Sequence, residues 1–132
     1  IKLKNGVFMK NEKILIVEDS SVTRAMIKEI LIEDGYSNIE EAVDGEEGVN
    51  KAKEKNYNLV ITDINMPKKT GIEVIEELRK KSFYLKTPLM ILTTERTEKM
   101  KEMGRKAGAT GWITKPINPN QFIKAVNTVL KN

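Results

Sequence analysis

Carboxylates stand directly after two apolar runs of this chain. Asp63 follows the run at residues 59–62, and the pair Glu18 and Asp19 follows the run at residues 14–17. An ionised carboxylate is costly to bury, so its place at the tip of a buried strand requires an explanation. If the two strands are neighbours, three carboxylates converge at one edge of a sheet. Such a cluster needs a cation, and a cation beside a nucleophilic carboxylate indicates phosphoryl chemistry.

Two more polar residues end segments of strand length. Thr93 ends the run at residues 89–93, and Lys115 ends the segment at residues 110–115. Because sites in parallel α/β sheets lie outside the carboxyl ends of the strands, we expect both residues to join the carboxylates there. The ammonium group of Lys115 and one divalent cation would balance the three negative charges. After phosphoryl transfer, the added negative charge would attract the hydroxyl group of Thr93 and hold Lys115.

The composition restricts the cation to one that oxygen atoms bind. The 132 residues include no cysteine and no histidine, so the chain offers neither thiolate nor imidazole ligands. Oxygen ligands favour magnesium, calcium or manganese. Magnesium fits best, because it binds few protein carboxylates and keeps water molecules that a phosphate can replace. We therefore predict Mg²⁺ as the cofactor.

Strand-like and helical patterns alternate along the chain and must bring these residues together. We predict strands at residues 13–18, 38–43, 59–63, 89–93 and 110–115. We predict helices from Ser20 or Ser21 to about Gly35, at residues 44–55, 72–80 and 97–107, and at the end of the chain through Phe122 and Leu130. Such alternation is typical of an α/β fold with a parallel sheet covered on both faces.

The helix predicted at residues 97–107 has the weakest pattern. We expect Met100 and Met103 to face the core, but Gly104 interrupts the helix. A glycine inside a helix costs about 1 kcal/mol relative to alanine.

Residues 1–9 lie outside the alternating pattern. The chain begins with Ile1 rather than methionine, and Met9 directly precedes the patterned part. We therefore predict that residues 1–9 are an extension that is disordered or was added artificially, and that residues 10–132 form one domain. A domain of this length buries enough surface to fold without a disulfide framework.

Charge and composition exclude two classes of partner. The formal net charge is +4, from 23 basic and 19 acidic residues, and aromatic residues make up 5% of the chain. A nucleic-acid surface would need a basic stripe interleaved with aromatic side chains, so we expect no nucleic-acid partner. No apolar run approaches the ~20 residues that span a bilayer, and no signal-peptide pattern is present. We expect no membrane insertion and a cytoplasmic location.

Four short segments together resemble the response regulator receiver domains. They are Val-Glu-Asp-Ser at residues 17–20, Thr-Asp-Ile-Asn-Met-Pro at residues 62–67, Ile-Leu-Thr-Thr-Glu at residues 91–95, and the pair Lys115 and Pro116. The resemblance covers residues 12–131. It implies a doubly wound (βα)5 parallel sheet of the flavodoxin-like or CheY-like type, with strand order 2-1-3-4-5.

The resemblance also implies a role for each carboxylate. Asp63 matches the phosphoacceptor, which receives the phosphoryl group from a phosphohistidine of a sensor histidine kinase. Glu18 and Asp19 match the acidic pair that holds Mg²⁺ together with Asp63, and the backbone carbonyl of Asn65 matches a further ligand. Such a domain assists its own phosphorylation and dephosphorylation and is not an enzyme in the usual sense.

The remaining matches concern the response to phosphorylation. Thr93 and Lys115 match the hydroxyl group and the lysine that contact the phosphoryl group, and the peptide bond between Lys115 and Pro116 is often cis in the family. Trp112 matches the switch aromatic, which is more commonly tyrosine or phenylalanine. On residue type alone, Trp112 could instead be an ordinary core or half-exposed strand residue.

The output of such a domain is a contact with another protein. Only Lys131 and Asn132 follow the last predicted helix, so we expect a stand-alone CheY-like chemotaxis regulator with a target such as the flagellar switch. The expected binding face suits an acidic target and includes Arg96, Lys99, Arg105, Trp112 and Lys124. Two alternatives stay open. One is a phosphorelay intermediate that passes the phosphoryl group to a histidine phosphotransferase, and the other is a receiver excised from a longer regulator.

Overall fold

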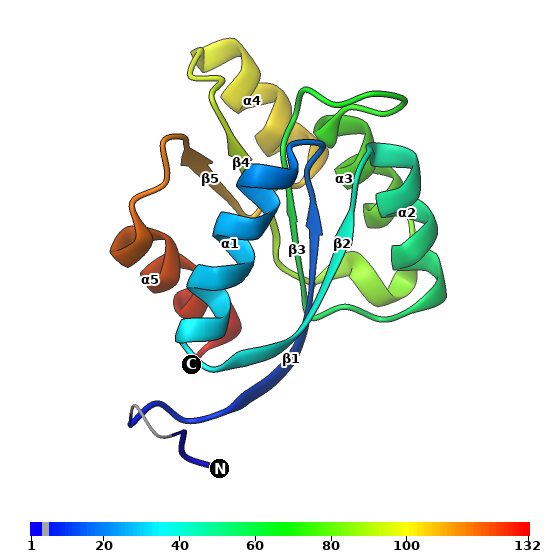
Figure 1. Cartoon of the computed structure of the whole chain (residues 1–132). Coiled ribbons are helices and arrows are strands. Elements are labelled where there is room, and N and C mark those ends of the chain that lie inside the picture. The colour runs from blue at the N-terminus through cyan, green and yellow to red at the C-terminus, as the bar shows by residue number, and fades with distance from the viewer. Residues whose placement is uncertain (4–5) are drawn as a thin grey trace.

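Parallel strands and α-helices alternate along the chain in the computed structural model, which describes residues 1–3 and 6–132 (Figure 1). The strands are β1 (Lys10–Val17), β2 (Tyr36–Ala42), β3 (Leu59–Thr62), β4 (Leu89–Thr93) and β5 (Gly111–Thr114). The helices are α1 (Ser21–Glu33), α2 (Gly45–Glu54), α3 (Gly71–Arg79), the short 3-10 helix η1 (Ser82–Leu85), α4 (Glu98–Ala107) and α5 (Pro119–Leu130). Within the described residues, no helix is both long and apolar enough to cross a membrane.

The order of the strands in the sheet is β2-β1-β3-β4-β5, and every neighbouring pair is parallel. This order confirms the predicted doubly wound α/β fold. β2 lies at one edge of the sheet, as its more polar sequence predicts. The strands β1 and β3, which precede the carboxylates, are direct neighbours near the middle of the sheet.

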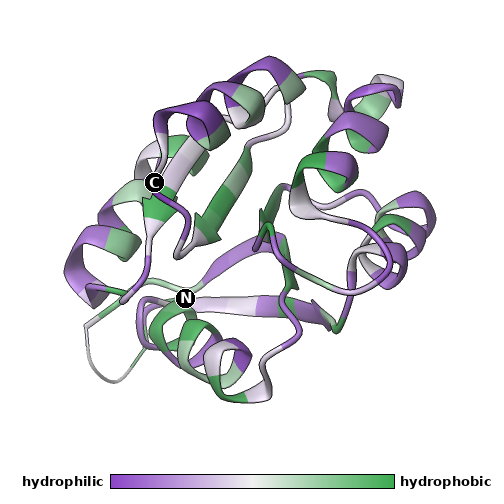
Figure 2. Cartoon of the chain, turned by 90° about the horizontal axis from the view of Figure 1, so that it is seen from above, coloured by the Kyte–Doolittle hydropathy of each residue, from purple (hydrophilic) through white to green (hydrophobic). Residues whose placement is uncertain are grey.

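The helices cover both faces of the sheet. α1 and α5 lie on one face, and α2, α3 and α4 lie on the other (Figure 1). Viewed from above, the helices carry both green and purple bands, as expected for amphipathic helices (Figure 2). Alternate strand residues supply two separate cores: Leu15 and Val60 pack in the core beside α2 and α3, whereas Ile16 and Ile61 pack in the core beside α1 and α5. Burial on both faces explains why the central strands are nearly all apolar.

A capping side chain begins each α-helix close to the carboxyl end of the preceding strand. Each cap accepts a hydrogen bond from a backbone N–H group in the first turn of its helix, and the five caps are Ser20, Asp44, Thr70, Thr97 and Asn118. Such a cap stabilises a helix by about 1 kcal/mol. Because the caps fix where the helices begin, they also define the ends of the loops around the carboxyl edge of the sheet.

Several local features of the structure differ from the sequence-based predictions. Met103 is exposed rather than inward-facing, because Gly104 occupies the buried position of α4. β1 begins at Lys10 rather than at residue 13, since it continues into a polar segment that pairs with β2. The helix η1 has four residues, which are too few to produce a helical period in the sequence.

The described part of residues 1–9 folds back on itself. Lys2 forms an isolated antiparallel bridge with Phe8, and the backbone N–H of Met9 donates to the carbonyl of Ile1 at 2.7 Å. Residues 4 and 5 lie outside the described part of the chain. That this segment is a disordered or artificial extension stays a prediction.

The guanidinium group of Arg79 joins three segments at the amino ends of β4 and β5. It donates hydrogen bonds to the carbonyl oxygens of Tyr84, of Thr87 at 2.8 Å and of Gly108 at 2.7 Å. Burial lowers the pKa of Arg79. Since Gly108 is the C-cap of α4, these bonds fix the C-terminal end of that helix.

Gly104 allows α4 to lie directly against the sheet. A Cβ atom at this position would stand 2.8 Å from Cζ3 of Trp112 and 3.0 Å from Cδ1 of Ile91. Both distances are shorter than ordinary van der Waals contacts, so any larger residue would push α4 away from β5.

We therefore predict that Gly104→Ala destabilises the protein. Helix propensity alone would stabilise α4 by about 1 kcal/mol. Overpacking costs about 1–3 kcal/mol, so we expect the free energy of unfolding in urea to fall by about 1 kcal/mol. Met103→Ala is the matched control: it changes an exposed side chain of the same helix, and we expect a change of about 0.5 kcal/mol or less. A Gly104→Ala variant more stable than the parent would contradict this account of α4 packing.

Candidate functional site

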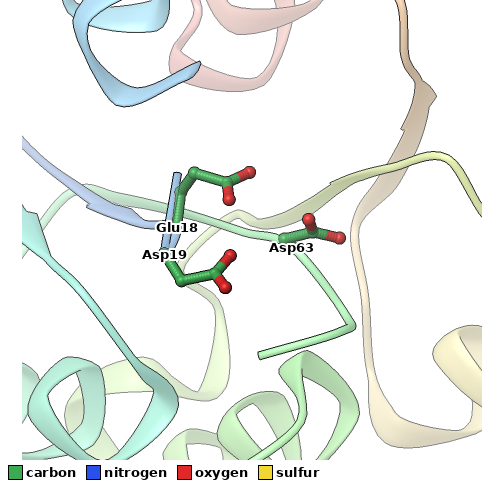
Figure 3. A group of neighbouring side chains, drawn as sticks. All are labelled: Glu18, Asp19 and Asp63. Carbon is green, nitrogen blue, oxygen red and sulfur yellow. The ribbon is translucent and has the colours of Figure 1, made fainter. Parts of the chain in front are cut away.

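The pairing of β1 with β3 brings the carboxylates together. Val17 is in register with Thr62, so the residues that follow them, Glu18 and Asp63, lie side by side just beyond the two strands. The backbone N–H of Asp63 donates to the carbonyl of Val17 at 3.1 Å and extends the pairing. Glu18, Asp19 and Asp63 each offer one oxygen atom, and these atoms lie within 4.8 Å of one another (Figure 3).

The three carboxylates differ in how many partners they have. Glu18 is buried, and its two oxygen atoms accept hydrogen bonds from the backbone N–H of Ser20 at 3.0 Å and from Nζ of Lys115 at 2.6 Å. Asp63 accepts from the backbone N–H of Ile64 at 2.6 Å and from Lys115 at 2.9 Å. Asp19 is exposed, and within the described residues its carboxylate has no hydrogen bond or ion pair. Asp19 is therefore free to bind a cation.

Lys115 lies between two of the carboxylates. Its side chain is 17% exposed and forms ion pairs with both Glu18 and Asp63. Burial lowers the pKa of Lys115, but the two carboxylates raise it more, so the pKa lies above its ordinary value. The backbone N–H of Lys115 donates to the carbonyl of Thr93 at 2.8 Å, which fixes the lysine at the end of β5. The peptide bond to Pro116 is cis, as the resemblance predicts.

Glu18 and Asp63 respond differently to the same lysine. Burial raises the pKa of Asp63, but hydrogen bonds from Lys115 and Thr93 lower it more, so the pKa lies below its ordinary value. For Glu18, burial raises the pKa more than Lys115 and Ser20 lower it. Asp63 is thus ionised at neutral pH, which is the state that a nucleophilic carboxylate needs.

Thr93 and Trp112 meet at the loop that follows β4. Thr93 is fully buried, helps to lower the pKa of Asp63 and accepts a hydrogen bond from the backbone N–H of Glu95 at 3.4 Å. The indole N–H of half-buried Trp112 donates to the carbonyl of Glu95 at 3.2 Å. The side chain of Asn65 also reaches this loop, because its amide donates to the carboxylate of Glu95 at 3.2 Å. A ligand role for the backbone carbonyl of Asn65 stays a prediction.

Two residues that support the site did not stand out in the sequence. Arg24 donates from Nη1 to the backbone carbonyl of Glu18 at 2.6 Å. Gly71 begins α3 directly beneath the phosphoacceptor candidate, and a Cβ atom there would stand 2.0 Å from the carbonyl oxygen of Asp63. A glycine directly after a cap residue is a weak signal for such an approach, whereas an arginine within a helix carries no signal for a backbone contact.

The donor set suits magnesium. All of the candidate ligands are oxygen atoms, and magnesium prefers one or two carboxylates together with water and phosphate oxygens. Glu18 is already bound to Lys115 and Ser20. Asp63 has partners of the same kind but is less buried than Glu18, and Asp19 is exposed, so these two carboxylates are the more accessible ones, whereas Glu18 contributes its charge from a buried position.

Comparisons with known proteins agree with this arrangement. Residues 14–127 match the protein family described as the response regulator receiver domain. The aerobic respiration control protein ArcA of Escherichia coli is 42% identical over 120 residues, which are 90% of this chain and 49% of ArcA. The transcriptional regulatory protein ResD of Bacillus subtilis is 34% identical over 119 residues, which are 90% of this chain and 48% of ResD. The chain thus spans about half the length of these curated relatives.

Solved structures show the same fold. The chemotaxis response regulator CheY4 of Vibrio cholerae has a TM-score of 0.85 and 39% sequence identity to this chain. The likeness covers 91% of this chain and 99% of the CheY4 chain.

Removing Lys115 should reveal the repulsion between the carboxylates. We predict that Lys115→Met lowers the free energy of unfolding at pH 7, without divalent cations, by about 2–3 kcal/mol, because the buried carboxylate of Glu18 and the mostly buried carboxylate of Asp63 lose their shared partner. Urea unfolding measures this loss. Lys99→Met, which changes an exposed lysine, serves as the control, with an expected change of about 0.5 kcal/mol or less.

The pH dependence of this effect has a definite sign. In the parent protein the lowered pKa of Asp63 contributes stability above the ordinary value of 3.8, and this contribution disappears as the pH falls through the lower folded pKa. Glu18 acts in the opposite sense, because a raised pKa adds stability as the pH falls toward its ordinary value of 4.5. In Lys115→Met, burial is no longer opposed by the lysine, so the pKa values of both Asp63 and Glu18 should be raised. The variant should therefore gain stability relative to the parent as the pH falls from about 7 to about 5. A constant difference between the two proteins across this range would rule out the proposed charge balance.

Proposed function

The chain belongs to the response regulator receiver family, and from this premise we propose that it is a phosphorylation-activated switch in which Asp63 accepts a phosphoryl group from a sensor histidine kinase. The observation that carries this proposal is the ionised carboxylate of Asp63, held beside the ammonium group of Lys115 and two further carboxylates at the carboxyl edge of the sheet. We propose a cytoplasmic location, which the match to the receiver family supports.

Phosphoryl transfer forms one bond and breaks another. A carboxylate oxygen of Asp63 attacks the phosphorus atom of the phosphohistidine, the P–N bond breaks, and its electron pair remains on the imidazole nitrogen. Lys115, whose Nζ lies 2.9 Å from Asp63, can follow the negative charge to an oxygen atom of the transferred group. Glu18, Asp19 and Asp63 would hold Mg²⁺, which when bound stabilises negative charge on the phosphoryl oxygens. In this proposal the protein assists the phosphorylation of its own Asp63 and is not an enzyme in the usual sense.

The phosphorylated state would reach the surface through Thr93. The new negative charge attracts the hydroxyl group of Thr93, which accepts a hydrogen bond from the backbone of Glu95 in the structure. A shift of Thr93 therefore changes the loop that carries Glu95. Because the carbonyl of Glu95 accepts the indole N–H of Trp112, the loop and the aromatic side chain are linked. This contact supports the assignment of Trp112 as the switch aromatic.

We propose that the output is a protein contact on the face formed by α4, β5 and α5. We call it the output face, and it carries Arg96, Lys99, Trp112 and Lys124. A groove of about 370 Å³ beside Trp112 is lined mainly by apolar side chains of β5 and α5. An apolar groove lined in part by the exposed Lys124 suits an acidic target segment with an apolar anchor. The flagellar switch is the first candidate, supported by the likeness to CheY4.

A second possibility for the output is that the chain is the receiver domain of a longer regulator and controls the rest of that protein. This alternative is favoured by ArcA and ResD, because each is about twice the length that the chain matches. The size of the full-length protein in cells distinguishes the two: a stand-alone chemotaxis regulator has the mass of the receiver alone. A phosphorelay role would instead show as efficient return of the phosphoryl group to a histidine phosphotransferase.

Phosphorylation should be confined to Asp63 and should require the cation. We predict that incubation with a phosphorylated histidine kinase or a small phosphodonor and Mg²⁺ adds one phosphoryl group, detected by mass analysis. Asp63→Asn keeps the shape of the side chain but lacks the nucleophilic oxygen, so it should remain unmodified. Trp112 is the only tryptophan, and its emission should change in the parent protein but not in the variant. Phosphorylation at another residue, or the absence of any phosphorylation in the presence of the phosphorylated kinase, would refute the assignment of Asp63.

Charge reversal on the output face should weaken target binding. We predict that Lys99→Glu combined with Lys124→Glu lowers the affinity of the phosphorylated protein for the flagellar switch protein by about tenfold or more, since tenfold corresponds to only about 1.4 kcal/mol. Calorimetry measures the affinity. The control variant combines Lys53→Glu with Lys80→Glu, which makes the same charge change on exposed residues of α2 and the end of α3. Equal affinity for both variants would exclude this face as the contact.

A further inference from the structure

Arg24 connects the first turn of α1 to the loop that carries Glu18 and Asp19. Its side chain is 13% exposed, and Nη1 donates to the backbone carbonyl of Glu18 at 2.6 Å. Nε of the same guanidinium group donates to the carboxylate of Glu41, at the end of β2, at 3.1 Å. One side chain thus fastens the end of β1 to both α1 and β2.

The bond to the carbonyl of Glu18 determines how Asp19 is placed. The carbonyl of Glu18 and the N–H of Asp19 belong to one planar peptide group, so fixing the first fixes the orientation of the second. The backbone N–H of Glu18 is held as well, because it donates to the carbonyl of Ala42 at 3.0 Å. The backbone from which the side chain of Asp19 projects is therefore held at both ends of Glu18.

This support matters more for Asp19 than for Glu18. The carboxylate of Glu18 is held directly by Lys115 and by the N–H of Ser20. The carboxylate of Asp19 has no such partner within the described residues. Its direction toward Asp63 consequently depends on the orientation of its own backbone.

The positive charge of Arg24 is compensated on the side away from the carboxylate cluster. Glu41 pairs with Arg24 at 3.1 Å and lies 3.5 Å from Nζ of Lys28. Arg24 contacts the cluster through a neutral carbonyl oxygen only. It can therefore hold the loop without taking the place of a cation.

We propose that Arg24 is a positioning residue of the cation site, which keeps the peptide group between Glu18 and Asp19 oriented so that Asp19 faces Asp63. This inference rests on the proposed function, in which the carboxylates bind Mg²⁺. Replacing a residue that contacts and orients a metal ligand commonly lowers metal affinity by about 10–100-fold.

The test is a titration of the metal-free protein with Mg²⁺ by calorimetry, with no phosphodonor present. We expect Arg24→Ala to raise the dissociation constant of Mg²⁺ by about tenfold or more. Glu41→Gln is the matched control, because it removes the ion pair but leaves the bond from Arg24 to the carbonyl of Glu18. We expect the dissociation constant of this control to stay within about threefold of that of the parent, which is less than the change of about 10–100-fold that follows the loss of a supporting contact. Arg24→Lys keeps the positive charge but loses the planar guanidinium group that makes both bonds. Its dissociation constant for Mg²⁺ should lie between those of Arg24→Ala and Glu41→Gln.

Kinetics separate positioning from general destabilisation. With a small phosphodonor, the Mg²⁺ concentration for half-maximal phosphorylation should rise in Arg24→Ala by the same factor as the dissociation constant, while the rate at saturating Mg²⁺ stays close to that of the parent. An unchanged dissociation constant in Arg24→Ala, or in a folded Arg24→Lys if the alanine variant does not fold, overturns the inference. If the parent itself binds no Mg²⁺, or if Asp19→Asn binds it as well as the parent, the proposed cation site fails and this inference with it.

Discussion

The ammonium group of Lys115, between the carboxylates of Glu18 and Asp63, is the contact on which the site depends. Burial, and to a smaller extent the neighbouring charge of Asp63, raises the pKa of Glu18 and so disfavours its charged form. Lys115 offsets one of the three carboxylate charges, and its two ion pairs join the end of β5 to the ends of β1 and β3. The negative charge that remains is equal in size and opposite in sign to that of one divalent cation. The protein's own side chains therefore leave the cluster incompletely neutralised.

The order of the strands makes this contact possible. β1 and β3 are neighbours, so their tips place Glu18 and Asp63 side by side, and β4 and β5 follow on one side only. The chain reverses its winding direction beside β1, which is where doubly wound sheets open to a ligand. Helix caps such as Ser20 and Thr70 then end the loops close to the strand tips. The polar cluster is therefore a consequence of the sheet order together with short, defined loops.

The pattern of the sequence predicted the alternation of elements and the residues that meet at the strand tips, because apolar runs and their polar ends are local features. It could not separate Glu18 from Asp19, since both follow the same run and only the fold decides which carboxylate reaches Lys115. The inward position of α4 was also misjudged: periodicity favoured Met103, but the bulk of Trp112 on the neighbouring strand leaves room only for Gly104. The bond from Arg24 to a carbonyl oxygen involves no side-chain partner, and so it leaves no trace in residue spacing.

The hydrogen bonds of Arg79 have a mechanical consequence for α4. They hold the helix at Gly108, at the end remote from the carboxylates, whereas its first residues follow the loop that contains Glu95. A helix of this length extends about 15 Å, so a small displacement of its free end turns it about a fixed pivot instead of translating it. The largest movement then falls near Lys99, and the smallest near Arg105. The two ends of α4 are therefore held differently, the C-terminal end by Arg79 and the N-terminal end by its Thr97 cap.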